Sequence, residues 1–208
     1  MRFGWDGRSG PQNAREEVSS RRKRRRRTVA VGGPNTIQQI VDRLATITRE
    51  RASLLLDETV AVDSKAGIII VKLEDMPAME SEDGQDYRFC VARVLPAGLD
   101  GCNYVNPHVH YRGEEPYRFL SGADGEMNSG RISGGEVRWS PARRVQPGDT
   151  VVIGEGEVHS FRNDGTEPAD FAFACPDSHL IDAGEEHPEG DRRFTENLEH
   201  GIPPWYRT

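Results

Sequence analysis

The spacing of apolar residues divides the chain into a short helical part and a longer part made of strands. Residues 36–56 place apolar side chains at intervals close to 3.6, which predicts one amphipathic helix that packs against a sheet face or a partner subunit. Asn35 or Thr36 can cap its start. From residue 67 onward, short β-rich runs alternate with turns rich in Gly and Pro. Such runs indicate an all-β sandwich or barrel.

The predicted strands determine the expected organisation of the chain. They cover residues 67–73, 87–95, 107–111, 117–120, 130–132, 136–139, 150–153, 158–162 and 171–174. We therefore expect four parts: a disordered basic arm at 1–34, an N-terminal helix at 35–58, a barrel at 59–180, and a C-terminal tail at 181–208 that packs on the barrel. The length of 208 residues suits one domain with an arm.

Charge is distributed unevenly along the chain. Residues 1–28 carry ten Lys and Arg against three Asp and Glu, whereas the remainder carries 17 against 31. The basic run at 21–27 could be a targeting or nucleic-acid patch, or translated sequence upstream of the natural start. We interpret it as a disordered arm without a role in the chemistry. The acidic body argues against nucleic acid and membranes as partners, and no apolar run reaches the length of a membrane span.

The cysteines predict no disulfide framework. Cys90, Cys102 and Cys175 are odd in number, widely spaced and without a CxxC pair. We interpret them as ordinary thiols of a reducing compartment, so the expected location is the cytoplasm.

A cluster of candidate metal ligands lies near the middle of the chain. His108 and His110 are two residues apart in a strand-like segment, so both imidazoles project to the same face. Neutral imidazole is a common ligand for divalent first-row metals. The carboxylate that follows is Glu114 or Glu115. An inward Glu114 would bring Arg118 inward beside the metal, and since a barrel interior should be apolar, Glu115 is the better ligand.

The register with Glu115 inward also directs Tyr117 and Phe119 to the interior. A third histidine, His159, shares a face with Phe161 in the strand predicted at 158–162, and a barrel can bring that strand opposite the first pair. His179 could mark a second site with nearby aspartates, but we favour an ordinary loop histidine.

Two segments carry a resemblance to a known family. Residues 101–122 resemble the first cupin motif, G-x5-H-x-H-x3,4-E-x6-G, with His108, His110 and Glu115 at its ligand positions. Residues 148–163 resemble the second motif, G-x5-P-x-G-x2-H-x3-N, with His159 at its ligand position. Gly101 lies one residue too far from the first histidine, and a glycine at 154 replaces the usual proline. Both departures affect turns rather than ligands.

The resemblance implies a fold and a metal site. The expected fold is all-β, a cupin double-stranded β-helix, or jelly-roll barrel, with an N-terminal helix and a disordered basic arm. The expected cofactor is one divalent metal ion, Fe, Mn, Ni, Co or Zn, bound by four ligands: His108, His110, Glu115 and His159.

The resemblance also implies a range of activities. We expect a metal-dependent enzyme of oxidoreductase (dioxygenase) type that acts on a small organic substrate. The fold alone does not distinguish this activity from two alternatives. These are a metal-dependent sugar isomerase or lyase and a non-catalytic small-molecule-binding cupin. A homodimer is the expected assembly.

The sequence also offers candidate residues for proton transfer and for substrate contact. Tyr117 and Glu115 are candidates for proton transfer. The residues expected to contact substrate are Arg93, Tyr104, Phe119 and Phe161. For Arg93, the competing interpretation is an outward salt bridge, because an inward arginine is unusual in an apolar barrel.

Overall fold

Strands dominate the computed structural model, which describes residues 33–203 apart from 60–61, 64–66, 98–102 and 123. Nearly all of the predicted basic arm, and residues 204–208 of the predicted tail, lie outside the described residues. In chain order the elements are α1 (Ile37–Leu44), α2 (Arg49–Asp57), β1 (Val62–Asp63), β2 (Ile68–Lys72), β3 (Met79–Glu80), β4 (Asp86–Val94), β5 (His108–Val109), β6 (Glu115–Phe119), β7 (Gly125–Ser133), β8 (Glu136–Trp139), β9 (Arg143–Val145), β10 (Thr150–Ile153), β11 (Glu157–Asn163), β12 (Ala169–Pro176), the 3₁₀ helix η1 (Asp177–Leu180) and β13 (Arg193–Phe194).

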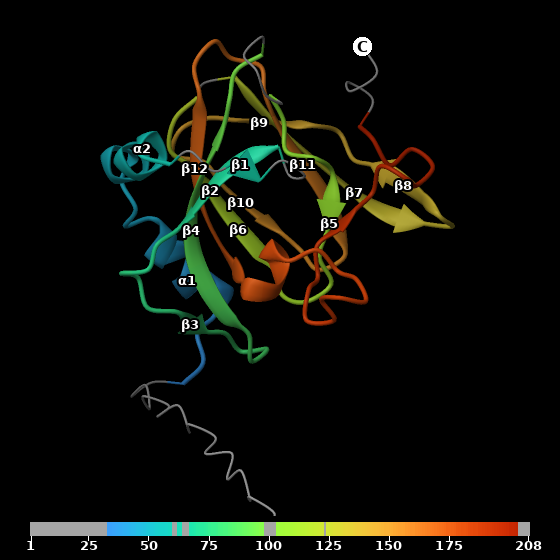
Figure 1. Cartoon of the computed structure of the whole chain (residues 1–208), viewed down its shortest axis with the longest axis horizontal. Coiled ribbons are helices and arrows are strands. Elements are labelled where there is room, and N and C mark those ends of the chain that lie inside the picture. Colours follow the sequence, from blue (N-terminus) through green and yellow to red (C-terminus); the bar gives the residue numbers. More distant parts are fainter. Residues whose placement is uncertain (1–32, 60–61, 64–66, 98–102, 123, 204–208) are drawn as a thin grey trace, which may run out of the picture. The chain divides into compact units, whose positions relative to one another are not determined.

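The strands form two antiparallel sheets that face each other (Figure 1). One has the order β1-β2-β4-β12-β6-β10, with β3 paired to β4, and the other has the order β13-β5-β11-β7-β8, with β9 paired to β7. Late strands thus lie between early ones, β12 between β4 and β6 and β11 between β5 and β7, as in a jelly roll. The predicted all-β jelly-roll fold is confirmed.

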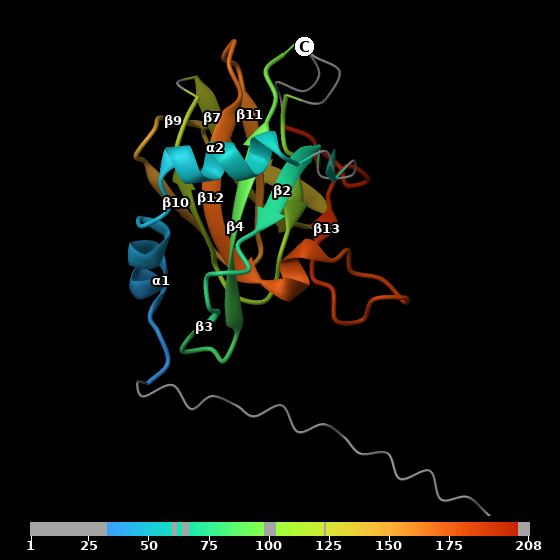
Figure 2. The ribbon, with the colours of Figure 1, turned by 60° about the vertical axis from the view of Figure 1, so that its left-hand side comes forward.

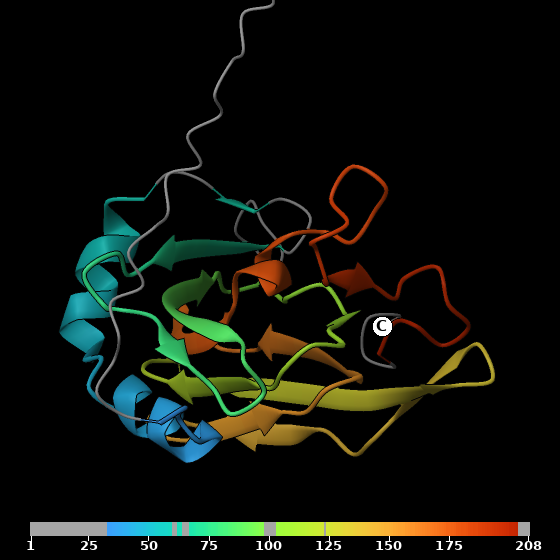
Figure 3. The same ribbon diagram turned by 90° about the horizontal axis from the view of Figure 1, so that it is seen from below.

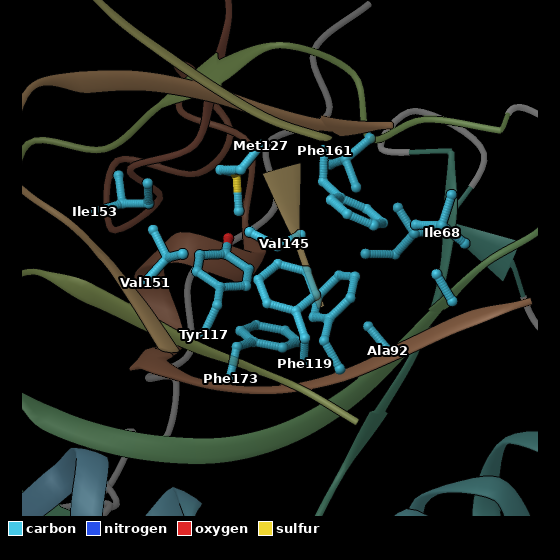
Figure 4. Close-up of a cluster of buried hydrophobic side chains, with 14 of the residues drawn as sticks. Ile68, Ala92, Tyr117, Phe119, Met127, Val145, Val151, Ile153, Phe161 and Phe173 are labelled. Carbon is cyan, nitrogen blue, oxygen red and sulfur yellow. The ribbon is translucent and has the colours of Figure 1, made fainter. Parts of the chain in front are cut away.

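The main core fills the space between the sheets. Along β4, Cys90, Ala92 and Val94 face this inner core, whereas Phe89 and Val91 face the opposite side, as strand alternation requires. Figure 4 shows the inner core as a group of aromatic and aliphatic side chains around Tyr117 and Phe119. Because β4 is buried on both faces, something must cover the outer face of its sheet.

Two helices provide that cover. Figure 2 shows α2 lying across the sheet that contains β2, β4 and β12. Ile40 and Leu44 of α1 and Ala52 and Leu56 of α2 are buried there. Each fully buried Leu or Ile contributes about 1.5–3 kcal/mol relative to an exposed one. Among the described residues, no helix is long and apolar enough to span a membrane.

The prediction of one continuous helix was wrong. The structure has two, because Thr48 is extended and its hydroxyl accepts a hydrogen bond from the amide of Arg51, which starts α2. Thr46 also bonds back to the carbonyl of Arg43 at the end of α1. Side chains of this kind compete with continued helix, and the 3.6 spacing of apolar residues persists across the break because both helices cover the same core.

The segment after β12 contributes a strand to the other sheet. It forms η1 and then β13, which pairs with β5 (Figure 3). Thr195 donates its amide hydrogen to the carbonyl of Pro107, which directly precedes β5. The C-terminal segment therefore reaches the strand that carries His108.

Candidate metal centre

Both sheets contribute to a buried polar cluster at one end of the inner core. His108 on β5 is directly opposite His159 on β11, and His110 follows β5. Glu115 begins β6 in the other sheet. The four side chains are buried, with residue exposures of 5%, 2%, 4% and 4% in this order. One ligand atom from each lies within 4.8 Å of the others.

The ring and carboxylate positions show how closely the cluster is packed. The ring centroid of His108 is 4.2 Å from that of His159 and 5.0 Å from that of His110. Oε2 of Glu115 lies 3.4 Å from Nε2 of His110 and 3.3 Å from Nε2 of His159. The cluster therefore consists of imidazole nitrogens directed at one carboxylate oxygen.

A tight turn links His110 to Glu115, and two carboxylates hold it in place. Oδ2 of Asp191 accepts hydrogen bonds from the amides of Tyr111 and Arg112, both at 2.8 Å. Oε1 of Glu155 accepts one from the amide of Gly113 at 2.6 Å. Three successive amides are thus fixed, which sets the spacing between the two ligand positions.

Gly113 is needed in this turn for two reasons. Its φ of +80° lies in the left-handed region, and a Cβ there would be 2.7 Å from the Tyr87 hydroxyl. No larger side chain fits without moving the turn.

Backbone carbonyls select the tautomer of two of the histidines. Nδ1 of His108 lies 2.7 Å from the carbonyl of Asn106, and Nδ1 of His159 lies 3.2 Å from that of Glu157. A neutral ring that donates from Nδ1 carries its lone pair on Nε2. Both rings therefore present a bare Nε2 to the cluster, the arrangement that outer partners of metal-binding histidines produce.

Burial keeps the rings of His108 and His110 neutral, whereas the carboxyl group of Glu115 stays ionised. Burial, reinforced by His159, lowers the pKa of His108 to about 3, and burial lowers that of His110 well below its usual value. For Glu115, burial raises the pKa, but the surrounding histidines outweigh it and bring the pKa down to about 2. At neutral pH, the neutral rings of His108 and His110 therefore lie beside one ionised carboxylate.

This donor set fits a divalent metal ion. Glu115 Oε2 is buried and has no hydrogen-bond partner among the described residues. A buried carboxylate without a compensating partner is strongly unfavourable, and a divalent cation held with three imidazole nitrogens would compensate it. The combination of nitrogen and oxygen donors suits Fe, Mn, Co, Ni or Zn.

His179 belongs to the same cluster, which sequence reasoning missed by treating it as a loop histidine. Its ring on η1 stacks on that of His110, with centroids 3.9 Å apart and planes 1° apart. Nε2 lies 2.6 Å from the carbonyl of Arg112 and so carries the hydrogen. Its buried Nδ1 has no partner among the described residues and lies 4.0 Å from Glu115 Oε2.

The cluster forms part of the wall of a small cavity. Tyr117 lines the cavity too, and its hydroxyl lies 3.1 Å from Nε2 of His159. Burial, together with the charge of Glu115, raises the pKa of this phenol well above its usual value, so it keeps its proton. The remaining walls are largely apolar: Ile68, Ile70, Val105, Met127, Phe161, Phe171, Phe173 and Leu180.

The structure places the other expected substrate contacts unequally. Phe161 lines the cavity, whereas Phe119 packs deeper, against Phe161 and Phe171. Tyr104 forms a single β-bridge with Arg162 and does not line the cavity.

Arg93 is not at the cavity either. It points to the outer face of its sheet, where it pairs with Asp170 and with Asp57 of α2. The competing interpretation, an outward salt bridge, is the one that the structure supports. On the same strand it is Cys90, Ala92 and Val94 that face inward.

Comparison with known proteins gives weak similarities. No family model matches the chain, and no curated protein matches it. Among solved structures, a recombinant oxalate oxidase in complex with glycolate is 19% identical, with a TM-score of 0.40 over 57% of this chain and 55% of that one. CapF with an inhibitor is 16% identical, with a TM-score of 0.44 over 64% of this chain and 32% of that one.

Oxalate decarboxylase from Bacillus subtilis is 21% identical, with a TM-score of 0.40 over 59% of this chain and 28% of that one. The match thus spans about half of the oxalate oxidase chain and about a third of the other two. Similarities at this level assign no activity, so the fold is assigned from the chain's own two-sheet topology.

Proposed function

We propose that this chain is a divalent-metal-dependent enzyme that acts on a small organic substrate, with an oxidoreductase of dioxygenase type as the preferred activity. The observation that carries the proposal is the buried cluster of His108, His110, Glu115 and His159, whose ligand atoms lie within 4.8 Å of one another beside a cavity. Four protein donors on a six-coordinate ion leave two positions for substrate and dioxygen.

The bound ion and the residues around the cluster would have different roles in the reaction. A bound ion would supply Lewis acidity and, if redox-active, the capacity to react with dioxygen. Tyr117 keeps its proton on the phenol oxygen and can donate a hydrogen bond to a substrate oxygen, since its hydroxyl lies beside His159 in the cavity wall. The apolar walls, Phe161 among them, exclude water and favour a compact organic substrate.

Metal analysis tests the ligand set. The purified chain should contain about one equivalent of metal. His108→Ala and His159→Ala should each lose most of it. Glu114→Ala is the matched control, because Glu114 neighbours the proposed ligand but is only half-buried and is absent from the cluster. A histidine variant that retains full metal content would show that the ligands are assigned wrongly.

Oxygen uptake tests the reaction type. The chain, reconstituted with Fe(II) or Ni(II), should consume dioxygen in the presence of a small acid or phenol. Turnover that proceeds equally well without oxygen would instead identify the isomerase or lyase alternative.

A further inference from the structure

One permanent positive charge lies in the wall of the cavity. Apart from the histidines and Glu115, Arg192 is the single charged residue among the described residues that line it. Arg192 comes from the C-terminal segment between η1 and β13, far from both motifs. Its side chain is 8% exposed, so the guanidinium faces the interior rather than solvent.

Two aspartates hold the guanidinium but do not saturate it. Asp182 Oδ1 lies 2.8 Å from Nε and 2.7 Å from Nη2, and Asp63 Oδ2 lies 2.8 Å from Nη1. Of the five N–H groups of an arginine, these contacts account for three and leave one on each terminal nitrogen. The side chains of the aspartates are 28% and 29% exposed, so they hold Arg192 from the solvent side.

The ring of Phe194 lies close to both the guanidinium of Arg192 and the candidate metal ligand His108. The guanidinium carbon lies 5.2 Å from the centre of the Phe194 ring, whose centre is 5.9 Å from that of His108. The arginine therefore lies in the wall of the same cavity as the cluster.

We propose that Arg192 is the specificity-determining residue of the cavity and that the substrate carries a carboxylate, held between the metal centre and the terminal N–H groups of Arg192. A divalent ion with one carboxylate ligand keeps a net positive charge, which favours an anionic ligand over a neutral one, and the remaining N–H groups of Arg192 can donate hydrogen bonds to that anion. The planar guanidinium matches a carboxylate in geometry as well as charge.

This inference rests on the proposed function, and a matched pair of ligands tests it separately. Lactate and lactamide both offer a hydroxyl and a carbonyl oxygen to a metal, but only lactate is negatively charged. The Co(II)-loaded full chain is titrated with each compound, and binding is followed through the visible absorption of cobalt. Cobalt content and thermal unfolding are recorded for every variant.

Lactate should bind the unsubstituted chain more tightly than lactamide does. Arg192→Gln should weaken lactate binding about 10–100-fold, the effect of losing a charged hydrogen bond, and leave lactamide unchanged. Arg192→Lys, which keeps the charge and disturbs the ion pairs least, should fall in between. Arg193→Gln is the matched control, because Arg193 is exposed and its guanidinium lies over the Tyr111 ring.

The outcomes separate the two proposals. If cobalt binds stoichiometrically but lactate binds no better than lactamide, or binds Arg192→Gln and Arg192→Lys as tightly as the unsubstituted chain, Arg192 is only a structural ion pair and the inference fails alone. If the unsubstituted chain binds no cobalt, the proposed function fails and the inference fails with it.

Discussion

The two faces of the seven-stranded sheet both bury charged groups, but only one face leaves them incompletely paired. On the outer face, under α2, Arg93 binds Asp170 through Nε at 2.7 Å and Nη2 at 2.9 Å, and its Nη1 binds Asp57. On the inner face, Glu115 Oε2 has no hydrogen-bond partner among the described residues, and neither does Nδ1 of His179.

This difference distinguishes charged groups that stabilise the fold from charged groups that bind a ligand. A buried ion pair in which each carboxylate has its cation attaches a helix to a sheet and needs no added ligand. A buried carboxylate surrounded by imidazole rings, without a hydrogen-bond partner of its own, is stabilised when a cation joins it. The outer face should therefore control folding stability, and the inner face should control ligand binding.

The largest expected effect is on the outer face. Arg93→Ala should lower the free energy of unfolding by about 3–5 kcal/mol, because it leaves Asp170, which is 3% exposed, without its cation. Urea denaturation measures the loss, and metal content per folded chain should not change.

Arg88→Ala is the control for this substitution. Arg88 pairs with Asp177 on the surface, with side chains 42% and 50% exposed, so at most about 1 kcal/mol should be lost. A lower metal content in folded Arg93→Ala would show that the outer face also affects the metal centre. That result would contradict the assignment of stability to one face and ligand binding to the other.

The next effect is on the inner face. His179→Ala should weaken metal binding about 10–100-fold, since His179 stacks on His110 and lies against Glu115 without belonging to the four-ligand set. A competition titration with a chelating dye measures the affinity. His187→Ala, at an exposed histidine, is the control. Equal affinities in the two variants would exclude His179 from the centre.

Acid should destabilise the metal-free chain through the inner face. The pKa of His108 falls from 6.5 to about 3 on folding, so between these values the unfolded chain binds more protons and stability falls as the pH falls. At pH 5 this amounts to about 2 kcal/mol relative to pH 7. Denaturation in the presence of a chelator at both pH values measures it, and His108→Gln should show a correspondingly flatter dependence.

The smallest effect concerns the turn between the ligands. Glu155→Gln should weaken metal binding by about tenfold at most, because it replaces a charged acceptor of the Gly113 amide with a neutral one. The same dye titration applies. A loss as large as that of His179→Ala would mean that the turn, rather than the stacked ring, controls the geometry of the centre.

The sequence predicted the parts of this arrangement that depend on local spacing. The alternation of side chains along a strand predicted that His108 and His110 share one face, and it favoured Glu115 over Glu114 as the ligand. In the structure Glu115 is buried and Glu114 is half-buried. It also placed Arg118 outside the interior, where it is half-buried.

Contacts between distant segments could not be predicted in this way. Asp191, His179 and Arg192 reach the centre from a segment whose polar, irregular sequence carries no periodic signal. Asp191 is 80 residues from Tyr111, whose amide it binds. Such pairings follow only from the path of the chain after β12, which hydrophobic spacing does not specify.

The most direct test of the account is the position of the metal itself. Crystals of the Co(II)-loaded chain, measured at the cobalt absorption edge, should show one anomalous peak about 2.0–2.2 Å from Nε2 of His108, His110 and His159 and from an oxygen of Glu115. A peak elsewhere, such as among the surface residues Glu136, Glu199 and His200, with none between the sheets, would contradict it.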